Sequence, residues 1–229
     1  MDGILKLEKS FSLSDCKRII DFFEKNPKRQ KKGKVGNVMA GGERGEPLST
    51  GRVDTIVKKS FDISMSFVRD DYAICTSIFK TLKSGMIEYM YRYPFLRNIE
   101  RWEILPSFNI QKYNPSDAYY GLHCENDGVG DTSLARMGVW MIYLNDVTDE
   151  GGTDFPAQKK KFQPCAGDLL IWPAFWTHPH RGIPSPTQTK YIATGWFTFY
   201  NAHHQLEQDM FSKRPLFYST HRKTINKHK

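Results

Sequence analysis

The run YGLHCEND at residues 120–127 places His123 and Glu125 on either side of Cys124. In an extended strand, residues two positions apart project to the same face, so this spacing predicts that the imidazole and the carboxylate converge. A second run, WTHPHRG at residues 176–182, offers His178 and His180. One of these histidines, brought close by folding, would complete a cluster of three polar ligands.

Two histidines and one carboxylate make the three-ligand face that is typical of non-haem iron(II) sites and leaves other coordination positions open. Zinc sites of hydrolases use similar ligands and are the chemical alternative. Residues 178 and 180 have the same parity in a strand, so geometry alone leaves the choice between His178 and His180 open. Asp127 could replace Glu125 as a ligand only if a turn replaced the strand.

Short strand-like runs separated by Gly, Pro, Asn and Asp follow Arg101. These runs are expected near residues 107–113, 118–124, 136–144, 161–165, 168–172 and 190–200. Many short strands after a helical segment predict an α+β, mainly β fold: a double-stranded β-helix, or jelly roll, buttressed by N-terminal helices.

Two helices are expected before these strands. Ser12 followed by Asp15 resembles a capping box, and the apolar residues after it predict a helix that ends near Pro27. A second helix, from about Tyr72 to Tyr93, has apolar residues at the spacing of one buried face and is followed by Pro94. We expect both helices to pack on a flat surface.

The length and composition are those of one globular domain, because 229 residues with 39% hydrophobic content can bury a sizeable core. We expect three parts: a helical support at residues 1–100 with a basic, Gly-rich loop at 28–52, a jelly-roll core at 101–202, and a basic extension at 203–229. The loop is expected to be either a mobile lid or a connector without a role.

The net charge of +8 is concentrated in the basic loop and in the tail after Lys213. A nucleic-acid partner stays open but has no aromatic or helical readout element to support it. The first residues lack the apolar stretch of a secretory signal, and no run of about 18 uncharged apolar residues occurs. With four widely spaced cysteines, these features predict a cytoplasmic protein without a membrane segment.

The order of the motifs resembles a known family. His123-x-Glu125, then HRG at residues 180–182, then Lys190 ten positions after His180 is similar to the signature of 2-oxoglutarate and iron(II)-dependent oxygenases, closest to the prolyl 4-hydroxylase-like branch. The resemblance covers roughly residues 105–200 and implies His123, Glu125 and His180 as the iron ligands. Most relatives have aspartate where Glu125 stands, so the carboxylate here is longer by one methylene.

The resemblance also implies a site for the co-substrate. Lys190 is expected to bind the distal carboxylate of 2-oxoglutarate, because a lysine inside a barrel is costly unless an anion neutralises it. Tyr113, and Tyr143 in the run MIYLND, are expected to contact the same carboxylate, and Trp196 also has a counterpart in the family. The runs EGGTDFP from Glu150 and GDLLIWP from Gly167 resemble further family elements.

The activity implied is that of a dioxygenase that converts 2-oxoglutarate and O2 to succinate and CO2 while it hydroxylates a substrate, which is expected to be a prolyl residue in a peptide or protein. Ascorbate is implied as an accessory reductant. Arg136 and Arg181 are tentative substrate contacts, with a surface salt bridge as the alternative for each. Alternative functions are oxygenation of a free amino acid or nucleic acid, halogenation, and an inactive binding module. Glu125 argues against halogenation, and the retained ligands argue against an inactive module.

Overall fold

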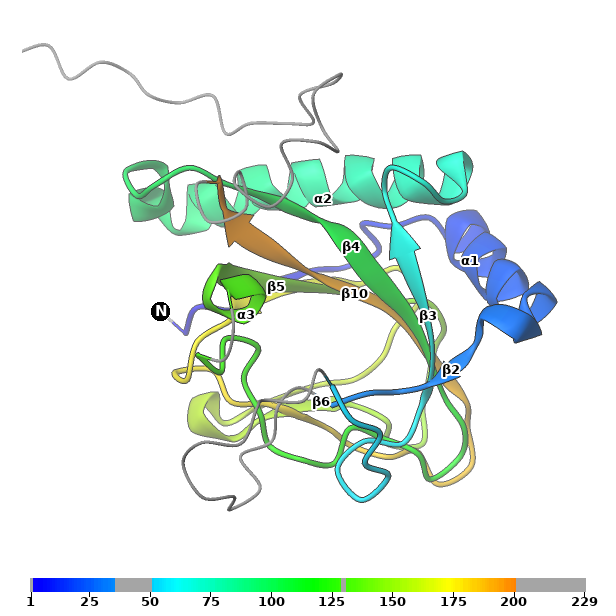
Figure 1. Cartoon of the computed structure of the whole chain (residues 1–229). Helices are drawn as coiled ribbons and strands as arrows, with labels where there is room; N and C mark the ends of the chain where they lie inside the picture. The colour runs from blue at the N-terminus through cyan, green and yellow to red at the C-terminus, as the bar shows by residue number, and fades with distance from the viewer. Residues whose placement is uncertain (1, 36–50, 129–130, 201–229) are drawn as a thin grey trace, which may run out of the picture.

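A computed structural model describes residues 2–35, 51–128 and 131–200 (Figure 1). The strands in chain order are β1 (Leu5–Leu7), β2 (Lys31–Lys32), β3 (Phe61–Ser66), β4 (Trp102–Tyr113), β5 (Arg136–Tyr143), β6 (Thr153–Phe155), β7 (Lys160–Phe162), β8 (Leu169–Pro173), β9 (Arg181–Gly182) and β10 (Lys190–Phe199). The helices are α1 (Leu13–Lys25), α2 (Tyr72–Arg92) and the short α3 (Asp131–Leu134), with 3-10 turns η1 (Pro27–Arg29), η2 (Pro94–Arg97) and η3 (Pro156–Gln158).

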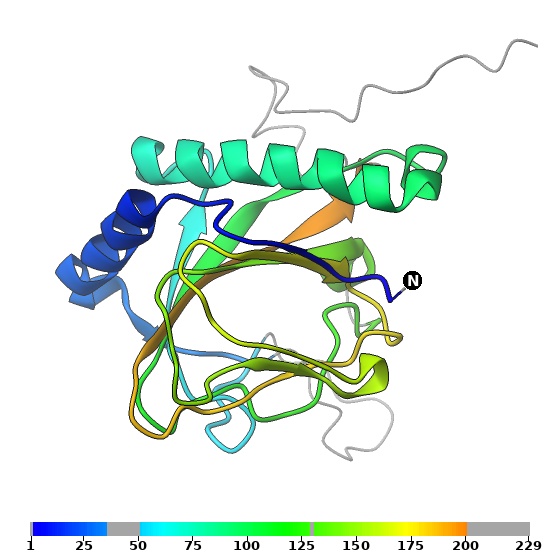
Figure 2. The same ribbon diagram turned by 180° about the vertical axis from the view of Figure 1, so that it is seen from behind.

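The strands form two antiparallel sheets. The larger sheet has the order β1-β8-β5-β10-β4-β3-β2, and the smaller sheet has the order β7-β6-β9. In both views, α2 runs along one side of the large sheet and the smaller sheet lies on the other side (Figures 1 and 2). This arrangement confirms the predicted mainly β class, a jelly roll buttressed by N-terminal helices.

Both predicted long helices are present, because their end signals are local in the sequence. The Ser12 hydroxyl caps α1 by accepting the backbone N–H of Asp15 at 3.1 Å. The Asp71 carboxylate caps α2 by accepting the N–H of Ile74 at 2.9 Å. Each helix ends just before a proline, which cannot continue the helical hydrogen bonds.

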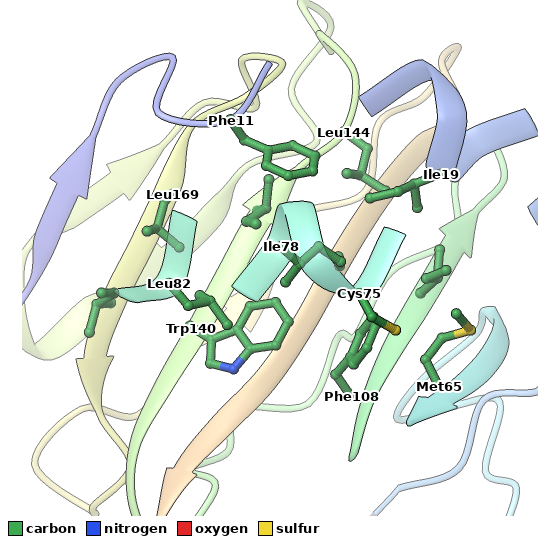
Figure 3. Packing of buried hydrophobic residues seen from close by; sticks show 14 of the residues in the cluster. Phe11, Ile19, Met65, Cys75, Ile78, Leu82, Phe108, Trp140, Leu144 and Leu169 are labelled. Atoms are coloured by element: carbon green, nitrogen blue, oxygen red, sulfur yellow. The ribbon is translucent and has the colours of Figure 1, made fainter. Parts of the chain in front are cut away.

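The buried face of α2 packs on the outer face of the large sheet. Ile78 and Leu82 of α2 share one apolar cluster with Phe108 of β4 and Trp140 of β5 (Figure 3). Gly85 permits the close approach, because a Cβ at this position would lie 2.7 Å from the Leu169 side chain. Each fully buried aliphatic side chain contributes about 1.5 to 3 kcal/mol, so this contact fixes α2 on the sheet.

A second apolar cluster lies between the two sheets. Along β5 the side chains alternate: Trp140 joins the cluster under α2, whereas Val139, Met141 and Tyr143 join the inner cluster. Phe155 of β6 belongs to the inner cluster as well, which places this cluster between the large and small sheets. The predicted site residues Tyr113, Tyr143 and Trp196 all contact it.

One predicted strand is wrong. Residues 118–124 form no ladder, and within the described chain they have only isolated bridges at Tyr119 and His123. The physical reason is that the segment pairs with a different partner at each step. Gly121 N donates to Val57 O, His123 N to His180 O, and Glu125 N to Ala174 O.

Five strands, β1, β2, β3, β6 and β9, lie outside the runs that were expected to form strands. β1 pairs with β8 and β3 pairs with β4, so residues 1–100 contribute strands as well as helices. The strand expected at 161–165 is β7, which ends before Pro164; a proline cannot donate to a ladder.

The expected boundaries between the three parts, near residues 100 and 202, stay predictions. Residues 36–50 of the basic loop and the extension at 203–229 lie outside the described residues. None of the described helices is both long and apolar enough to cross a membrane.

Candidate metal centre

His123 and His180 are brought together by backbone pairing outside the named strands. His123 N donates to His180 O at 3.0 Å, and His180 N donates back to His123 O at 2.9 Å. Two residues on, Glu125 N donates to Ala174 O at 3.0 Å. These non-local bonds hold the first histidine and the carboxylate against the loop that carries the second histidine.

The three side chains converge on one point. Nε2 of His123 lies 3.5 Å from Oε1 of Glu125, and Nε2 of His180 lies 3.7 Å from the same oxygen. One potential ligand atom from each residue lies within 4.8 Å of the others. Two imidazole nitrogens and a carboxylate oxygen in this arrangement fit a single divalent ion such as iron or zinc.

The hydrogen bonds of the imidazoles direct one lone pair of each ring toward this point. Nδ1 of His123 lies 2.9 Å from Gly121 O, and Nδ1 of His180 lies 3.1 Å from His178 O. A carbonyl oxygen only accepts, so in each ring Nδ1 carries the proton and Nε2 is left as an electron-pair donor. This is the tautomer that binds a metal through Nε2.

His178 does not join the cluster. Its Nδ1 lies 2.9 Å from the Thr177 hydroxyl and its Nε2 lies 2.7 Å from Asp2 O, so both ring nitrogens are already engaged. Asp127, the other open alternative, is also absent from the cluster, and its carboxylate accepts the Ser133 hydroxyl. Of the alternatives left open by the sequence, the structure thus brings together His123, Glu125 and His180.

The electrostatics of the cluster favour metal-binding protonation states. Burial alone would raise the pKa of Glu125, but hydrogen bonds and charge interactions with His123 and His180 hold that pKa well below its usual range. Burial and the neighbouring His123 lower the pKa of His180, although Glu125 opposes part of the shift. An ionised carboxylate beside a neutral imidazole is the state that a divalent cation requires.

Trp196 and Arg136 both contact Glu125. The Trp196 indole N–H donates to Oε2 of Glu125 at 2.8 Å, which leaves Oε1 facing the histidines. Arg136 donates to the backbone O of Glu125 at 2.9 Å, and its guanidinium lies 4.0 Å from the centroid of the Trp196 ring. These contacts orient the carboxylate, and the predicted cofactor role of Trp196 and substrate role of Arg136 stay predictions.

Lys190 is a buried cation at the start of β10, with 5% of its surface exposed. Its Nζ donates to Gly151 O at 2.6 Å and lies 5.1 Å from the centroid of the Tyr113 ring. Burial lowers the pKa of Lys190 to about 8. No carboxylate of the described chain pairs with this ammonium group, so an anionic ligand would relieve the cost of burying it.

The two predicted tyrosines line the same interior. The Tyr143 hydroxyl lies 2.6 Å from Thr153 Oγ1, and the Tyr113 hydroxyl donates to Gln111 Oε1 at 2.7 Å. Burial raises the pKa of both tyrosines, so each hydroxyl remains protonated and can donate a hydrogen bond. Contact of either hydroxyl with the co-substrate stays a prediction.

Arg181 lies apart from these groups: it is the first residue of β9 and is exposed, whereas His180 directly before it is buried. Its Nε donates to Asp154 Oδ2 at 3.0 Å, and half of the side chain is exposed. It borders a cavity of about 450 Å³ that Tyr120 and Lys161 also line. The surface salt bridge offered as the alternative for Arg181 is present, and its substrate contact stays a prediction.

Aromatic rings frame the two histidines, and one of them, Tyr119, was not anticipated. The Tyr119 ring stacks on His123 with ring centroids 3.7 Å apart. Phe155 stacks on His180 at 5.3 Å, and Trp172 meets the same ring edge-on at 5.0 Å. Phe155 and Trp172 lie in the EGGTDFP and GDLLIWP runs, which marked them as family elements, whereas no local signal marks Tyr119.

The chain is similar to known proteins over the region that contains these residues. Residues 108–198 match the model of the 2OG-Fe(II) oxygenase superfamily. A protein named putative prolyl 4-hydroxylase from Acanthamoeba polyphaga mimivirus is 30% identical over 124 residues, which cover 45% of this chain and 51% of that relative. The chain therefore spans about half the length of this curated relative.

Two solved structures share the fold over most of the chain. A Pseudomonas putida prolyl-4-hydroxylase has a TM-score of 0.62 at 15% identity, covering 86% of this chain and 94% of that one. A prolyl hydroxylase from Trichoplax adhaerens, in complex with a hypoxia inducible factor peptide fragment, has a TM-score of 0.62 at 16% identity, covering 90% and 87%. Residues 108–198 of this chain are thus similar to the 2OG-Fe(II) oxygenase superfamily, and the described chain shares its fold with prolyl hydroxylases.

Proposed function

We propose that the chain is an iron(II)- and 2-oxoglutarate-dependent dioxygenase that hydroxylates prolyl residues in a peptide or protein. The observation that carries the proposal is the convergence of His123, Glu125 and His180, with one potential ligand atom of each within 4.8 Å of the others. The match of residues 108–198 to the 2OG-Fe(II) oxygenase model supports iron(II) over zinc at this donor set.

The three ligand residues would hold the metal, and their neighbours would hold the ligands in place. When bound, iron(II) with 2-oxoglutarate and O2 supplies the oxidising chemistry, in which one oxygen atom ends in succinate, CO2 is released, and the other oxygen atom enters a substrate C–H bond. Trp196 keeps Oε2 of Glu125 occupied with a 2.8 Å hydrogen bond. The backbone carbonyls of Gly121 and His178 hold the proton of each imidazole on Nδ1.

Lys190 would bind the distal carboxylate of 2-oxoglutarate. The ammonium group is buried and has Gly151 O as its hydrogen-bond acceptor, so a carboxylate would replace a weak partner with a charged one. Tyr113, whose ring lies below this ammonium group, and Tyr143 would supply neutral donors to the same anion.

Apolar rings line the interior between the sheets beside His180. Phe155 and Trp172 pack on His180 and on each other, with centroids 5.3 Å apart. Such an apolar wall strengthens electrostatic contacts with a bound anion and limits side reactions. The chain's own contribution would thus be the geometry of the ligands and an apolar wall beside His180.

The prolyl substrate is supported by the curated relative named a putative prolyl 4-hydroxylase and by the peptide in the Trichoplax complex. Arg136, beside Trp196 and Glu125, is the better placed of the two tentative substrate residues. Arg181 would contact substrate only at the outer cavity. Ascorbate as an accessory reductant belongs to the same proposal.

The test combines a binding signal with a product. Anaerobic addition of iron(II) and 2-oxoglutarate should give a weak visible charge-transfer band, and His180→Ala should abolish it. Proline-rich peptides incubated with iron(II), 2-oxoglutarate and O2 should gain one oxygen on proline, detected by mass spectrometry, with an equal amount of succinate. Turnover of free amino acids or nucleotides without peptide hydroxylation would reject the prolyl substrate and leave the oxygenase proposal standing.

A further inference from the structure

His178 connects the N-terminal segment Asp2–Ile4 to the loop that carries His180. Its Nε2 donates to Asp2 O at 2.7 Å, and its Nδ1 accepts the Thr177 hydroxyl at 2.9 Å. Only 8% of the residue is exposed. A buried histidine with both nitrogens satisfied by fixed partners is held in one position.

The N-terminal segment is itself held in place from α2 and β7. Tyr89 of α2 donates its hydroxyl to Gly3 O at 2.8 Å. Lys160 of β7 forms an ion pair with the Asp2 carboxylate. Directly after the segment, β1 pairs with β8, the strand that leads into the loop of His178. The carbonyl that receives His178 is therefore anchored independently of the metal centre.

The same histidine controls the ligand two residues later. The backbone O of His178 accepts Nδ1–H of His180 at 3.1 Å, and this bond sets the orientation of the His180 ring and leaves its Nε2 facing Glu125. We propose that the segment Asp2–Ile4 forms part of the support of the metal centre, with His178 as the positioning residue that transmits its hold to His180. This inference rests on the proposed metal site.

Gly3 makes the contact sensitive to a remote change. The residue has φ +75, and a Cβ added to it would lie 2.5 Å from Nε2 of His178. An alanine at this position would be strained at this φ and would clash with the His178 ring, so the ring and Asp2 O would have to move apart. Loss of outer partners of metal-binding histidines typically weakens metal affinity about 10- to 100-fold. His178→Ala and Gly3→Ala keep the His178 carbonyl and only release its position, so we expect about tenfold weaker binding, the lower end of this range.

The experiment is a titration of the metal-free full chain with Co(II), followed by its visible absorption, which reads metal affinity and geometry without turnover. His178→Gln retains a donor for Asp2 O and should keep Co(II) affinity within about fivefold of wild type, unlike His178→Ala. Lys17→Ala is the matched control, because it removes a lysine and its exposed ion pair with Asp21 on α1 and leaves every contact of Asp2–Ile4 in place. It should change the affinity by less than about threefold, as exposed ion pairs contribute little.

A double-mutant cycle isolates the contact. Gly3→Ala should weaken Co(II) binding in the wild-type background but add little in the His178→Ala background, because the ring that would transmit a shift of Asp2–Ile4 to His180 is absent. If His178→Ala does not fold, judged by thermal unfolding of the metal-free protein, His178→Gln and Gly3→Ala carry the test.

Three results would overturn the inference. The first is Co(II) affinity in Gly3→Ala equal to that of wild type. The second is an additive cycle. The third is loss of binding in His178→Gln as large as in His178→Ala with an altered spectrum, which would make His178 a direct ligand. Failure of the wild-type protein to bind Co(II) at all would instead overturn the metal centre, and this inference with it.

Discussion

Replacing Lys190 with methionine should make the protein more stable and at the same time weaken its hold on 2-oxoglutarate. Burial lowers the pKa of Lys190 from 10.5 to about 8. One pKa unit corresponds to about 1.4 kcal/mol, so burying this charge at pH 7 costs about 3 kcal/mol. Methionine fills a similar volume without charge but leaves Gly151 O without its donor, a loss of about 1 to 2 kcal/mol. We expect a net gain of about 1 to 2 kcal/mol in the free energy of unfolding.

The pH dependence of this gain has a definite sign. The pKa of Lys190 is lower in the folded than in the unfolded chain, so between pH 8 and 10.5 the unfolded chain binds more protons. The stability of the wild type therefore rises with pH across this window. The advantage of Lys190→Met should be complete below pH 8 and fade toward pH 10.5, as measured by urea unfolding of both proteins at a series of pH values.

Lys58→Met provides the matched control, because Lys58 is 4% exposed but forms an ion pair with Asp62 at 2.7 Å. The same substitution there should destabilise the protein by about 1 to 3 kcal/mol, since it leaves a carboxylate without its cation. Calorimetric titration should show 2-oxoglutarate affinity about 10- to 100-fold weaker in Lys190→Met. Equal loss of stability in Lys190→Met and Lys58→Met at all pH values would refute the account of Lys190 as a buried, uncompensated charge. Unchanged 2-oxoglutarate affinity in Lys190→Met would remove Lys190 from the co-substrate site.

Three further substitutions test other parts of the structure. Trp196→Phe removes the 2.8 Å hydrogen bond to Glu125. Because hydrogen bonds to charged groups are worth about 1.5 to 3 kcal/mol, this variant should bind Co(II) at least about tenfold more weakly. Its melting temperature should stay close to that of the wild type. Gly195→Ala would put a Cβ 2.6 Å from the Trp140 ring and should cost about 1 to 3 kcal/mol in urea unfolding; a neutral result would mean that β10 can shift. Ser12→Ala removes the cap of α1 and should cost about 1 kcal/mol without changing metal affinity.

The parts of the fold that the sequence predicted are those with local signals. The capping residue Ser12 and the proline after each helix mark α1 and α2 nearly to the residue. Continuous apolar runs such as MGVWMIY identify β5, because its two faces are both covered. In contrast, β1 is three residues long and β3 begins with an exposed phenylalanine, so neither stands out from loop sequence.

The sequence indicated which three residues form the candidate site, but not the backbone contacts that bring them together. The spacing of His123 and Glu125 suggested a strand, yet the segment is held by separate bonds to Val57, His180 and Ala174, which no local pattern reveals. Likewise, strand geometry cannot distinguish His178 from His180, because the two residues are two positions apart. Only the hydrogen bond of His178 to Asp2 O, far away in the chain, shows that His178 is not the metal ligand of this cluster. Such contacts depend on tertiary structure, so periodicity cannot supply them.

The length of the Glu125 side chain suits the irregular backbone on which it is held. From a backbone tied to Ala174 O, the side chain spans from the Trp196 indole, 2.8 Å from Oε2, to the two imidazoles, 3.5 and 3.7 Å from Oε1. An aspartate on the same backbone would withdraw its carboxylate by about one C–C bond, roughly 1.5 Å, and could not keep the Trp196 contact while facing both histidines. The length of the Glu125 side chain therefore allows one carboxylate to contact Trp196 and to face both histidines from this irregular backbone, which the His-x-Glu spacing alone could not reveal.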